Sequence, residues 1–128
     1  MIRVAAAVIH NDEGKLLIAR RREGKSQAGL WEFPGGKIEP DESVQCCLQR
    51  ELSEEMKITI FPYEAFGSNE HHYGSLHIQL IAWKAEYQGG EILLVDHDAY
   101  QWVRPDELAR FEFAPADVPF VERLIKEV

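Results

Sequence analysis

Residues 36–58 read GKIEPDESVQCCLQRELSEEMKI, a stretch in which a glycine loop leads into an acidic helix. Four apolar residues recur in it at helical spacing: Val44, Leu48, Leu52 and Met56. This spacing predicts an amphipathic helix that begins at Asp41, its expected N-cap, and ends near Met56. Such a helix buries its apolar side, so the stretch predicts a sheet for it to cover.

Three glutamates lie where this helix should be apolar. With about 100° per residue, Glu51 and Glu55 fall within the apolar sector and Glu54 falls beside it. Because like charges at this spacing repel and partial burial raises the cost, a cation is expected to hold them. Oxygen ligands on one face suit Mg²⁺ or Mn²⁺, and Mg²⁺ often shares its coordination with substrate phosphates. Three earlier acids are expected to form a solvated face: Glu39, Asp41 and Glu42.

The segment Gly35-Gly36-Lys37 stands between a short strand and this helix. Glycines permit a close approach of the backbone, so next to an acidic helix they predict a cradle for phosphate or metal, with Lys37 as a charge. The segment is not a P-loop, because it lacks the spaced glycines and the Lys-Ser/Thr pair.

The remainder of the chain predicts mainly strands and hairpins. Expected strands cover 2–9, 16–19, 30–33, 58–66, 76–87, 92–95 and 100–103. A short helix is expected over 105–109, and a last one over 115–128 with an apolar stripe of Val118, Val121, Leu124, Ile125 and Val128. The expected fold class is α+β, a mixed sheet with helices on its faces, in one domain covering 1–128.

Composition narrows the possible partners. The 128 residues carry 14 basic and 22 acidic side chains, a net charge of -8. No basic face for a nucleic-acid polymer is expected, although an acidic protein can bind a small anion if metal ions supply positive charge. The longest apolar run is too short to cross a membrane. The adjacent Cys46 and Cys47 match neither a disulfide nor a metal pattern, which favours a reducing cytoplasm.

The stretch 36–58 resembles the Nudix box. In that motif a Gly and five residues precede a Glu, and seven more precede Arg-Glu-aliphatic, one residue, Glu-Glu, one residue, Gly and an aliphatic residue. Eight positions match: Gly36, Glu42, Arg50, Glu51, Leu52, Glu54, Glu55 and Ile58. Lys57 stands where the family has its second Gly, which normally leaves the helix with positive φ. The departure concerns the helix exit rather than the chemistry.

The resemblance covers nearly the whole chain and points to the MutT-type nucleoside triphosphate pyrophosphohydrolases. It implies a mixed sheet between helices and Mg²⁺-dependent hydrolysis of a nucleoside triphosphate to monophosphate and pyrophosphate. Metal ligands implied by position are Glu51, Glu54, Glu55, the Gly35 carbonyl and Asp96, with Asp98 as the alternative to Asp96. Arg50 would orient the glutamates, and Arg21 and Lys37 would meet the phosphates. Glu51 is the expected general base, and Glu54 is next.

The expected substrate is CTP, dCTP or 5-methyl-dCTP. Phe33 could stack on the base or belong to the core, and Asp117 could accept a hydrogen bond from the exocyclic amine of cytosine or cap the last helix. Related 8-oxoguanine enzymes often have Asn at this place, so hydrolysis of 8-oxo-dGTP is the main alternative. A catalytically silent nucleotide-sensing module and an ADP-ribose or dinucleotide hydrolase are the others. A monomer or homodimer is expected.

Overall fold

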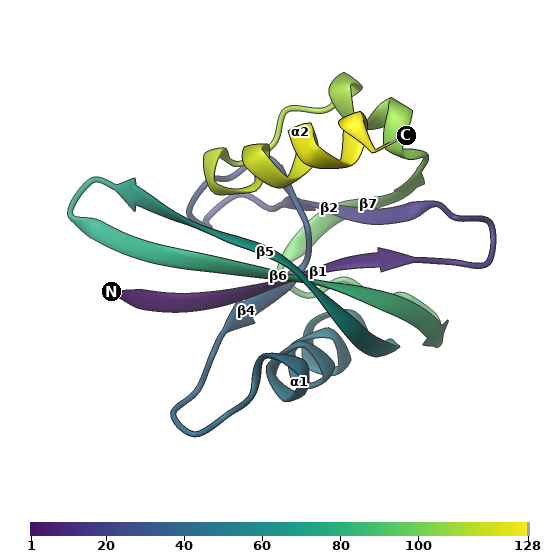
Figure 1. Cartoon of the computed structure of the whole chain (residues 1–128), viewed down its shortest axis with the longest axis horizontal. Helices are drawn as coiled ribbons and strands as arrows, with labels where there is room; N and C mark the ends of the chain where they lie inside the picture. The colour runs from purple at the N-terminus through teal and green to yellow at the C-terminus, as the bar shows by residue number, and fades with distance from the viewer. Residues whose placement is uncertain (128) are drawn as a thin grey trace.

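The computed structural model describes residues 1–127 and shows a mixed, seven-stranded sheet with a helix on each side (Figure 1). The strands are β1 (Ile2–His10), β2 (Leu16–Arg21), β3 (Trp31–Glu32), β4 (Gly35–Lys37), β5 (Thr59–Tyr73), β6 (Leu76–Gly89) and β7 (His97–Val103). The helices are α1 (Val44–Met56) and α2 (Val118–Lys126), with short 3₁₀ helices η1 (Pro105–Arg110) and η2 (Pro115–Asp117). The predicted α+β class is confirmed.

Strand β1 lies at the centre of the sheet. The strand order is β3-β2-β1-β6-β5, with β4 paired to β1 and β7 paired to β2. The β1–β6 pair is parallel and the other pairs are antiparallel. No helix among residues 1–127 is long and apolar enough to cross a membrane.

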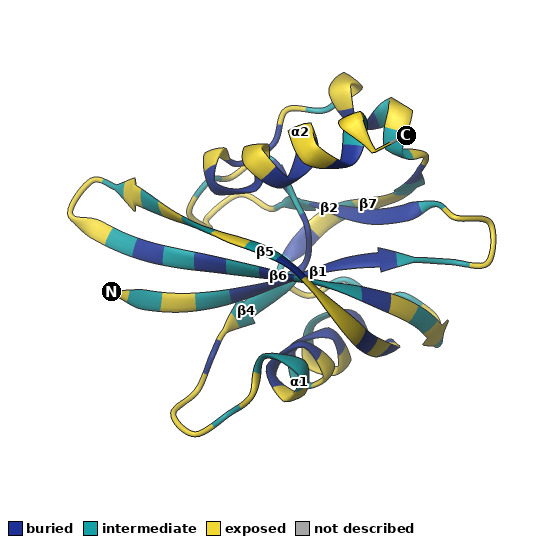
Figure 2. Ribbon diagram, viewed as in Figure 1, coloured by how far each residue is buried: buried dark blue, intermediate teal, exposed yellow. Residues whose placement is uncertain are grey.

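The continuous apolar run of β1 serves two cores, one on each face of the sheet (Figure 2). Ala6 and Val8 pack on the side covered by α2, whereas Ala5, Ala7 and Ile9 pack on the side covered by α1. Alternate residues of a strand point to opposite faces, so a strand with two covered faces reads as an unbroken apolar run.

The start of α1 differs from the prediction. Ser43 is the N-cap, and its Oγ accepts a hydrogen bond from the Cys46 N–H at 3.1 Å. Asp41 lies two residues earlier with φ of 64°, so the prediction of Asp41 as the cap is wrong. Asp and Ser are both common N-cap residues. Asp41 lies instead in the turn after Pro40, so the helix begins later and Ser43 caps it.

The exit of α1 keeps the turn that glycine favours, although Lys57 occupies it. Lys57 has φ of 60°, its N–H donates to the Leu52 carbonyl, and its Nζ donates to the Glu54 carbonyl at 2.9 Å. A left-handed conformation costs a residue other than glycine about 1 kcal/mol. The Nζ contact ties the side chain to the last turn of the helix.

One further prediction is wrong at the level of elements. Residues 92–95 lie in irregular backbone instead of a strand, and the Leu93 N–H donates to the Met56 carbonyl at 3.1 Å. In α2, Phe120, Val121 and Leu124 are buried, whereas Val118 is exposed, because η2 shifts the start of the helix. Val128 lies outside the described residues.

Candidate active site

Glu51, Glu54 and Glu55 form an acidic ridge along α1. Glu51 is buried with 9% of its surface exposed, Glu55 is partly buried, and Glu54 is exposed. This order follows from helical spacing, because Glu51 and Glu55 share the side of α1 that packs on the sheet. The ridge therefore has one carboxyl group that is buried against the sheet, that of Glu51, and one that is exposed to solvent, that of Glu54.

Strand β4 runs between β1 and the ridge, with space for glycine alone. A Cβ on Gly36 would lie 2.2 Å from Cδ of Glu51, and a Cβ on Gly35 would lie 1.9 Å from the Ala5 carbonyl oxygen. The backbone at Ala5 excludes a side chain at Gly35, and a side chain at Gly36 would have to displace the Glu51 carboxylate. The glycine pair brings the backbone of β4 directly against the Glu51 carboxylate, as the predicted cradle requires.

Arg50 ties the ridge to the loop before the helix. Its Nε and Nη2 donate to the Glu42 carboxylate at 2.8 and 2.9 Å, and its Nη1 donates to Glu51 at 2.9 Å and Glu54 at 3.4 Å. Its Nη2 also donates to the Lys37 carbonyl at 3.2 Å. The guanidinium therefore fixes the direction of two ridge carboxylates at once.

Glu42 does not belong to a solvated face, contrary to the prediction. The hydrogen bond from Arg50, with another from the Glu39 N–H, lowers the pKa of Glu42 to about 2. Its carboxylate remains ionised and holds the guanidinium in place. Glu39 and Asp41 are exposed, as expected.

Asp96 joins the acidic ridge, whereas Asp98 does not. Burial, then Asp96 and Glu51, raise the pKa of Glu55 to about 9, and Lys25 Nζ lies 3.1 Å from Asp96 Oδ1. Asp98 pairs instead with the exposed Arg20 at 2.7 Å. Of the two acids left open by the sequence, the structure brings Asp96 to the ridge.

The donor set of the ridge fits a hard divalent cation. Asp96 and Glu51 raise the pKa of Glu55, and such a group of acids is stabilised by a proton or by a metal ion placed between its members. Within residues 1–127, no group of three His, Cys, Asp or Glu side chains is arranged so that it could coordinate a metal ion as it stands. Arg50 and Lys25 instead hold Glu51 and Asp96.

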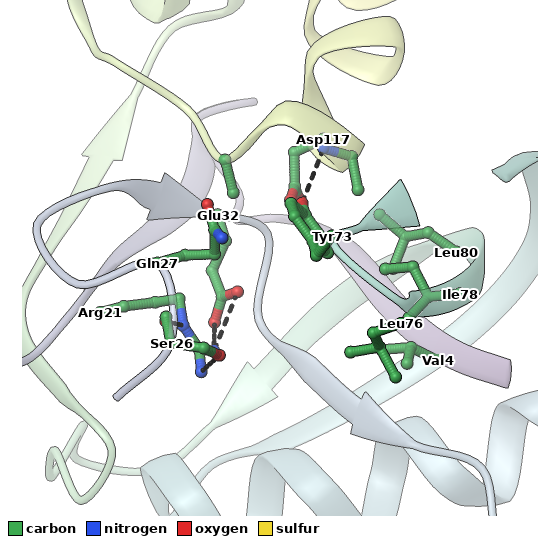
Figure 3. A pocket seen from close by; sticks show the side chains of 12 residues that line it. Val4, Arg21, Ser26, Gln27, Glu32, Tyr73, Leu76, Ile78, Leu80 and Asp117 are labelled. Atoms are coloured by element: carbon green, nitrogen blue, oxygen red, sulfur yellow. Dashed lines mark hydrogen bonds and ion pairs between the residues drawn. The ribbon is translucent and has the colours of Figure 1, made fainter. Parts of the chain in front are cut away.

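A cavity of about 250 Å³ lies among residues of β1, β2, β6 and the η2 turn (Figure 3). Its polar wall carries Arg21, Glu32, Tyr73 and Asp117, and its apolar wall comes from β1, β6 and the loop before η2. A narrower hollow of about 80 Å³ shares Arg21, Glu32 and Asp117 with this cavity and reaches Gly35 and Gly36. The narrower hollow therefore lies next to the cavity and also touches the strand that covers Glu51.

Asp117 is a buried acid at the inner wall of the cavity. It is 5% exposed, and its Oδ1 accepts a hydrogen bond from the Phe33 N–H at 3.0 Å. Burial, with the charge of Glu32, raises the pKa of Asp117 well above its ordinary value, and the Phe33 N–H and Arg21 partly oppose the shift. Oδ1 is committed to Phe33, which leaves Oδ2 for a ligand.

Arg21 reaches the cavity as part of a chain of three residues. Its Nη1 donates to both oxygens of Glu32 at 3.2 Å, and Nε2 of the buried His97 lies 2.8 Å from Glu32 Oε2. The sequence reasoning missed Glu32, His97 and Tyr73. A charged residue within the apolar run Leu30–Phe33 was the available signal for Glu32, because a glutamate there requires a partner.

Phe33 and Lys37 are placed differently from the other predicted substrate residues. The Phe33 side chain is 2% exposed and packs against Phe113 with ring centroids 5.4 Å apart, so its ring belongs to the core and touches only the narrower hollow. Lys37 is exposed on β4 and lines a separate hollow with residues 1–3 and 38–42. The structure does not bring Lys37 into the cavity with Arg21 and Asp117.

The fold and this site agree with a known family. A model of the NUDIX domain matches residues 5–123. The chain belongs to the Nudix family. As a Nudix hydrolase it is an enzyme, as predicted, and such hydrolases generally use a divalent cation.

Similar proteins place this Nudix domain among the MutT-like members. It is 43% identical to the CTP pyrophosphohydrolase of Escherichia coli over 95% of this chain and 90% of that protein. It is 32% identical to the 8-oxo-dGTP diphosphatase of the same organism, over 96% and 95%. The crystal structure of a MutT protein from Methanosarcina mazei superposes with a TM-score of 0.88 at 31% identity, covering 98% of this chain and 94% of that one.

Proposed function

We propose that this Nudix hydrolase converts a nucleoside triphosphate to the monophosphate and pyrophosphate with Mg²⁺, and prefers cytosine nucleotides. One observation carries the proposal. The cavity with Asp117 on its wall shares Arg21, Glu32 and Asp117 with a second hollow, and that hollow reaches the Gly35–Gly36 strand, which lies on the Glu51 carboxylate. A base in the cavity would therefore direct its phosphate chain toward the acidic ridge.

The residues of the ridge would hold the metal. Glu51, Glu54, Glu55 and Asp96 supply carboxylate oxygens, and the Gly35 carbonyl is a further candidate ligand. Bound Mg²⁺ would neutralise the polyphosphate and lower the pKa of a water molecule. Mn²⁺ offers the same preference for oxygen and should substitute.

The protein's own groups then handle substrate position and the proton. Arg21 would meet the phosphate chain from the wall shared by the two hollows. As water attacks phosphorus, the bond to the bridging oxygen breaks, and a carboxylate takes the proton from the water. We assign this proton to Glu51, because its carboxylate lies against Gly36, where the narrower hollow ends. Glu54 is the alternative acceptor.

The preference for cytosine follows from how Asp117 is held. Because the Phe33 N–H occupies Oδ1, Oδ2 is the oxygen left to accept a hydrogen bond. The exocyclic amine of cytosine is a donor, and an acidic side chain is its natural acceptor. The relative named CTP pyrophosphohydrolase is consistent with this assignment.

Hydrolysis of 8-oxo-dGTP is the second candidate, and the raised pKa of Asp117 is the observation that favours it. A protonated carboxyl both donates and accepts, as Asn does, and could pair with a purine edge. Two relatives named 8-oxo-dGTP diphosphatase match at 32% and 31% identity.

A substrate screen tests the proposal. Purified protein is incubated with Mg²⁺ and one of CTP, dCTP, 5-methyl-dCTP, dUTP, dGTP or 8-oxo-dGTP, and phosphate is measured with and without added pyrophosphatase. Phosphate that appears only with pyrophosphatase identifies pyrophosphate as the product. We expect the highest kcat/KM with cytosine nucleotides. A clear preference for 8-oxo-dGTP selects the second candidate, and turnover of none of these nucleotides rejects both.

A further inference from the structure

Asp117 lies at the end of η2, a 3₁₀ turn of three residues that is too short to satisfy its own backbone hydrogen-bonding groups. Within η2, Ala116 is 2% exposed, so both polar groups of its backbone are buried. Buried N–H and C=O groups require partners, and the first N–H groups of a helix find none inside it. The partners of Ala116 therefore decide where the turn, and with it Asp117, is placed.

Both partners come from one distant strand, β5. The Ala116 N–H donates to the Tyr73 hydroxyl at 3.0 Å, and Asn69 Nδ2 donates to the Ala116 carbonyl at 2.9 Å. Asn69 and Tyr73 are four residues apart on the strand, so they share one face of the sheet. His71, between them on that face, packs its ring on Tyr73 with centroids 4.6 Å apart.

The same strand end forms part of the cavity wall. Tyr73 and Leu76 flank the tip of the β5–β6 hairpin, and both line the cavity, with Tyr73 next to Asp117 (Figure 3). The hairpin tip and η2 therefore meet at the cavity, and their connection passes through the two hydrogen bonds to Ala116.

We propose that Asn69 and Tyr73 are positioning residues that set base selectivity by clamping Ala116, and thereby fix the Asp117 carboxylate at the reading position. The proposal deepens the proposed function and rests on it. Without these two hydrogen bonds to Ala116, which we call the clamp, η2 still carries Asp117, but the Oδ2 atom of Asp117 no longer has a fixed position relative to the base. Discrimination between an amine and a keto group depends on that place, because donor and acceptor must align to within a few tenths of an ångström.

Tyr73→Phe is the central test, because it removes one oxygen atom and keeps the ring. Rates are measured for dCTP and dUTP, which differ at the exocyclic group that Asp117 would read. An unpaired buried N–H in the turn is expected to lower the dCTP/dUTP ratio of kcat/KM about tenfold. The loss should appear mainly as a higher KM for dCTP, with kcat within about twofold, since the ridge is untouched. Asn69→Leu should act in the same direction.

Tyr63→Phe is the matched control. Tyr63 lies on the same strand and also carries a hydrogen-bonded hydroxyl, 2.9 Å from His10 Nε2, but it does not line the cavity. Its removal should leave the dCTP/dUTP ratio unchanged. A general loosening of β5 would change both variants alike and would overturn the proposal.

A double variant shows whether Tyr73 acts through Asp117. In Asp117→Ala the reading group is gone, so adding Tyr73→Phe should change the ratio no further. Additive effects would mean that Tyr73 contacts the base by itself, and the clamp would be rejected. An unchanged ratio in Tyr73→Phe, with wild type discriminating between the two nucleotides, would also reject it. If wild type hydrolyses no nucleotide, the proposed function fails and the clamp fails with it, whereas an unchanged ratio beside an active, discriminating wild type rejects the clamp alone.

Discussion

The acidic ridge of α1 and the wall of the cavity are both built around carboxyl groups, but the two regions treat them differently. Arg50 donates to Glu42, Glu51 and Glu54, and it lowers the pKa of Glu42 to about 2. At the cavity wall, burial raises the pKa of Asp117 well above its ordinary value, and a backbone N–H, that of Phe33, donates to its carboxyl group. A cluster of acids held by a cationic side chain suits metal ions and phosphate, whereas a buried acid at a fixed position suits recognition of a base.

The largest expected effect is the loss of turnover when the metal, or a carboxylate of the ridge, is removed. EDTA should abolish turnover, and Mg²⁺ or Mn²⁺ should restore it. Glu54→Gln should lower kcat at least about 100-fold, the scale of one lost charge-stabilising group. Asp117→Asn serves as the control, with metal dependence like that of wild type. Full turnover in EDTA would disprove the assignment of the ridge as a metal site.

Asp117→Asn should place a hydrogen-bond donor where the wild-type cavity wall offers an acceptor to the base. The Phe33 N–H would retain the amide oxygen, which turns the amide N–H₂ group toward the base, where it opposes the amine of cytosine. We expect kcat/KM for dCTP to fall by about 1–3 kcal/mol in transition-state free energy. The ranking of dCTP, dUTP and 8-oxo-dGTP is the measurement, and a ranking identical to wild type would contradict this role.

The protonation of Asp117 should appear in selectivity rather than in rate. As pH rises through the raised pKa of Asp117, Oδ2 loses its proton and becomes an acceptor only. The dCTP/dUTP ratio of kcat/KM should therefore increase with pH, at values above the ordinary aspartate range of about 4. Taking the ratio cancels the titration of the ridge, which both substrates share. In Asp117→Asn the ratio should be flat in this range, and a parallel rise there would point to another group.

The smallest effect concerns stability. The folded pKa of Glu55 is about 9, above its ordinary value of 4.5, so its ionisation opposes folding, and the cost grows as pH rises between these two values. Glu55→Gln removes the cost and should melt no lower than wild type without metal. Its advantage should increase with pH to about 2–5 °C. Mg²⁺ should raise the melting temperature of wild type more than that of the variant.

Thermal melts at several pH values, with and without Mg²⁺, measure this difference. Glu39→Gln is a suitable control, because Glu39 is an exposed acid outside the ridge. A Glu55→Gln protein that melts well below wild type without metal would show that Glu55 supports the fold rather than a cation.

Much of the ridge was predictable because its residues are close in sequence. Helical spacing alone places Glu51 and Glu55 on the packed side of α1, and the structure shows Glu51 buried and Glu54 exposed. The cavity was less predictable. Asp117 was found through the family resemblance, because related 8-oxoguanine enzymes often have Asn at this place. Glu32 and Tyr73 were missed, because β3 and β5 reach the cavity only through the folding of the sheet.

The sequence by itself determined the class of the fold, the acidic helix and the glycine pair, since each rests on local periodicity or on the space that a residue type requires. Tertiary structure decided which residues share a site. It selected Asp96 over Asp98, joined Glu42 to Arg50, placed Lys37 away from the cavity, and connected Asn69 and Tyr73 to the turn of Asp117. These are contacts between distant segments, and local spacing carries no information about which buried polar groups will meet.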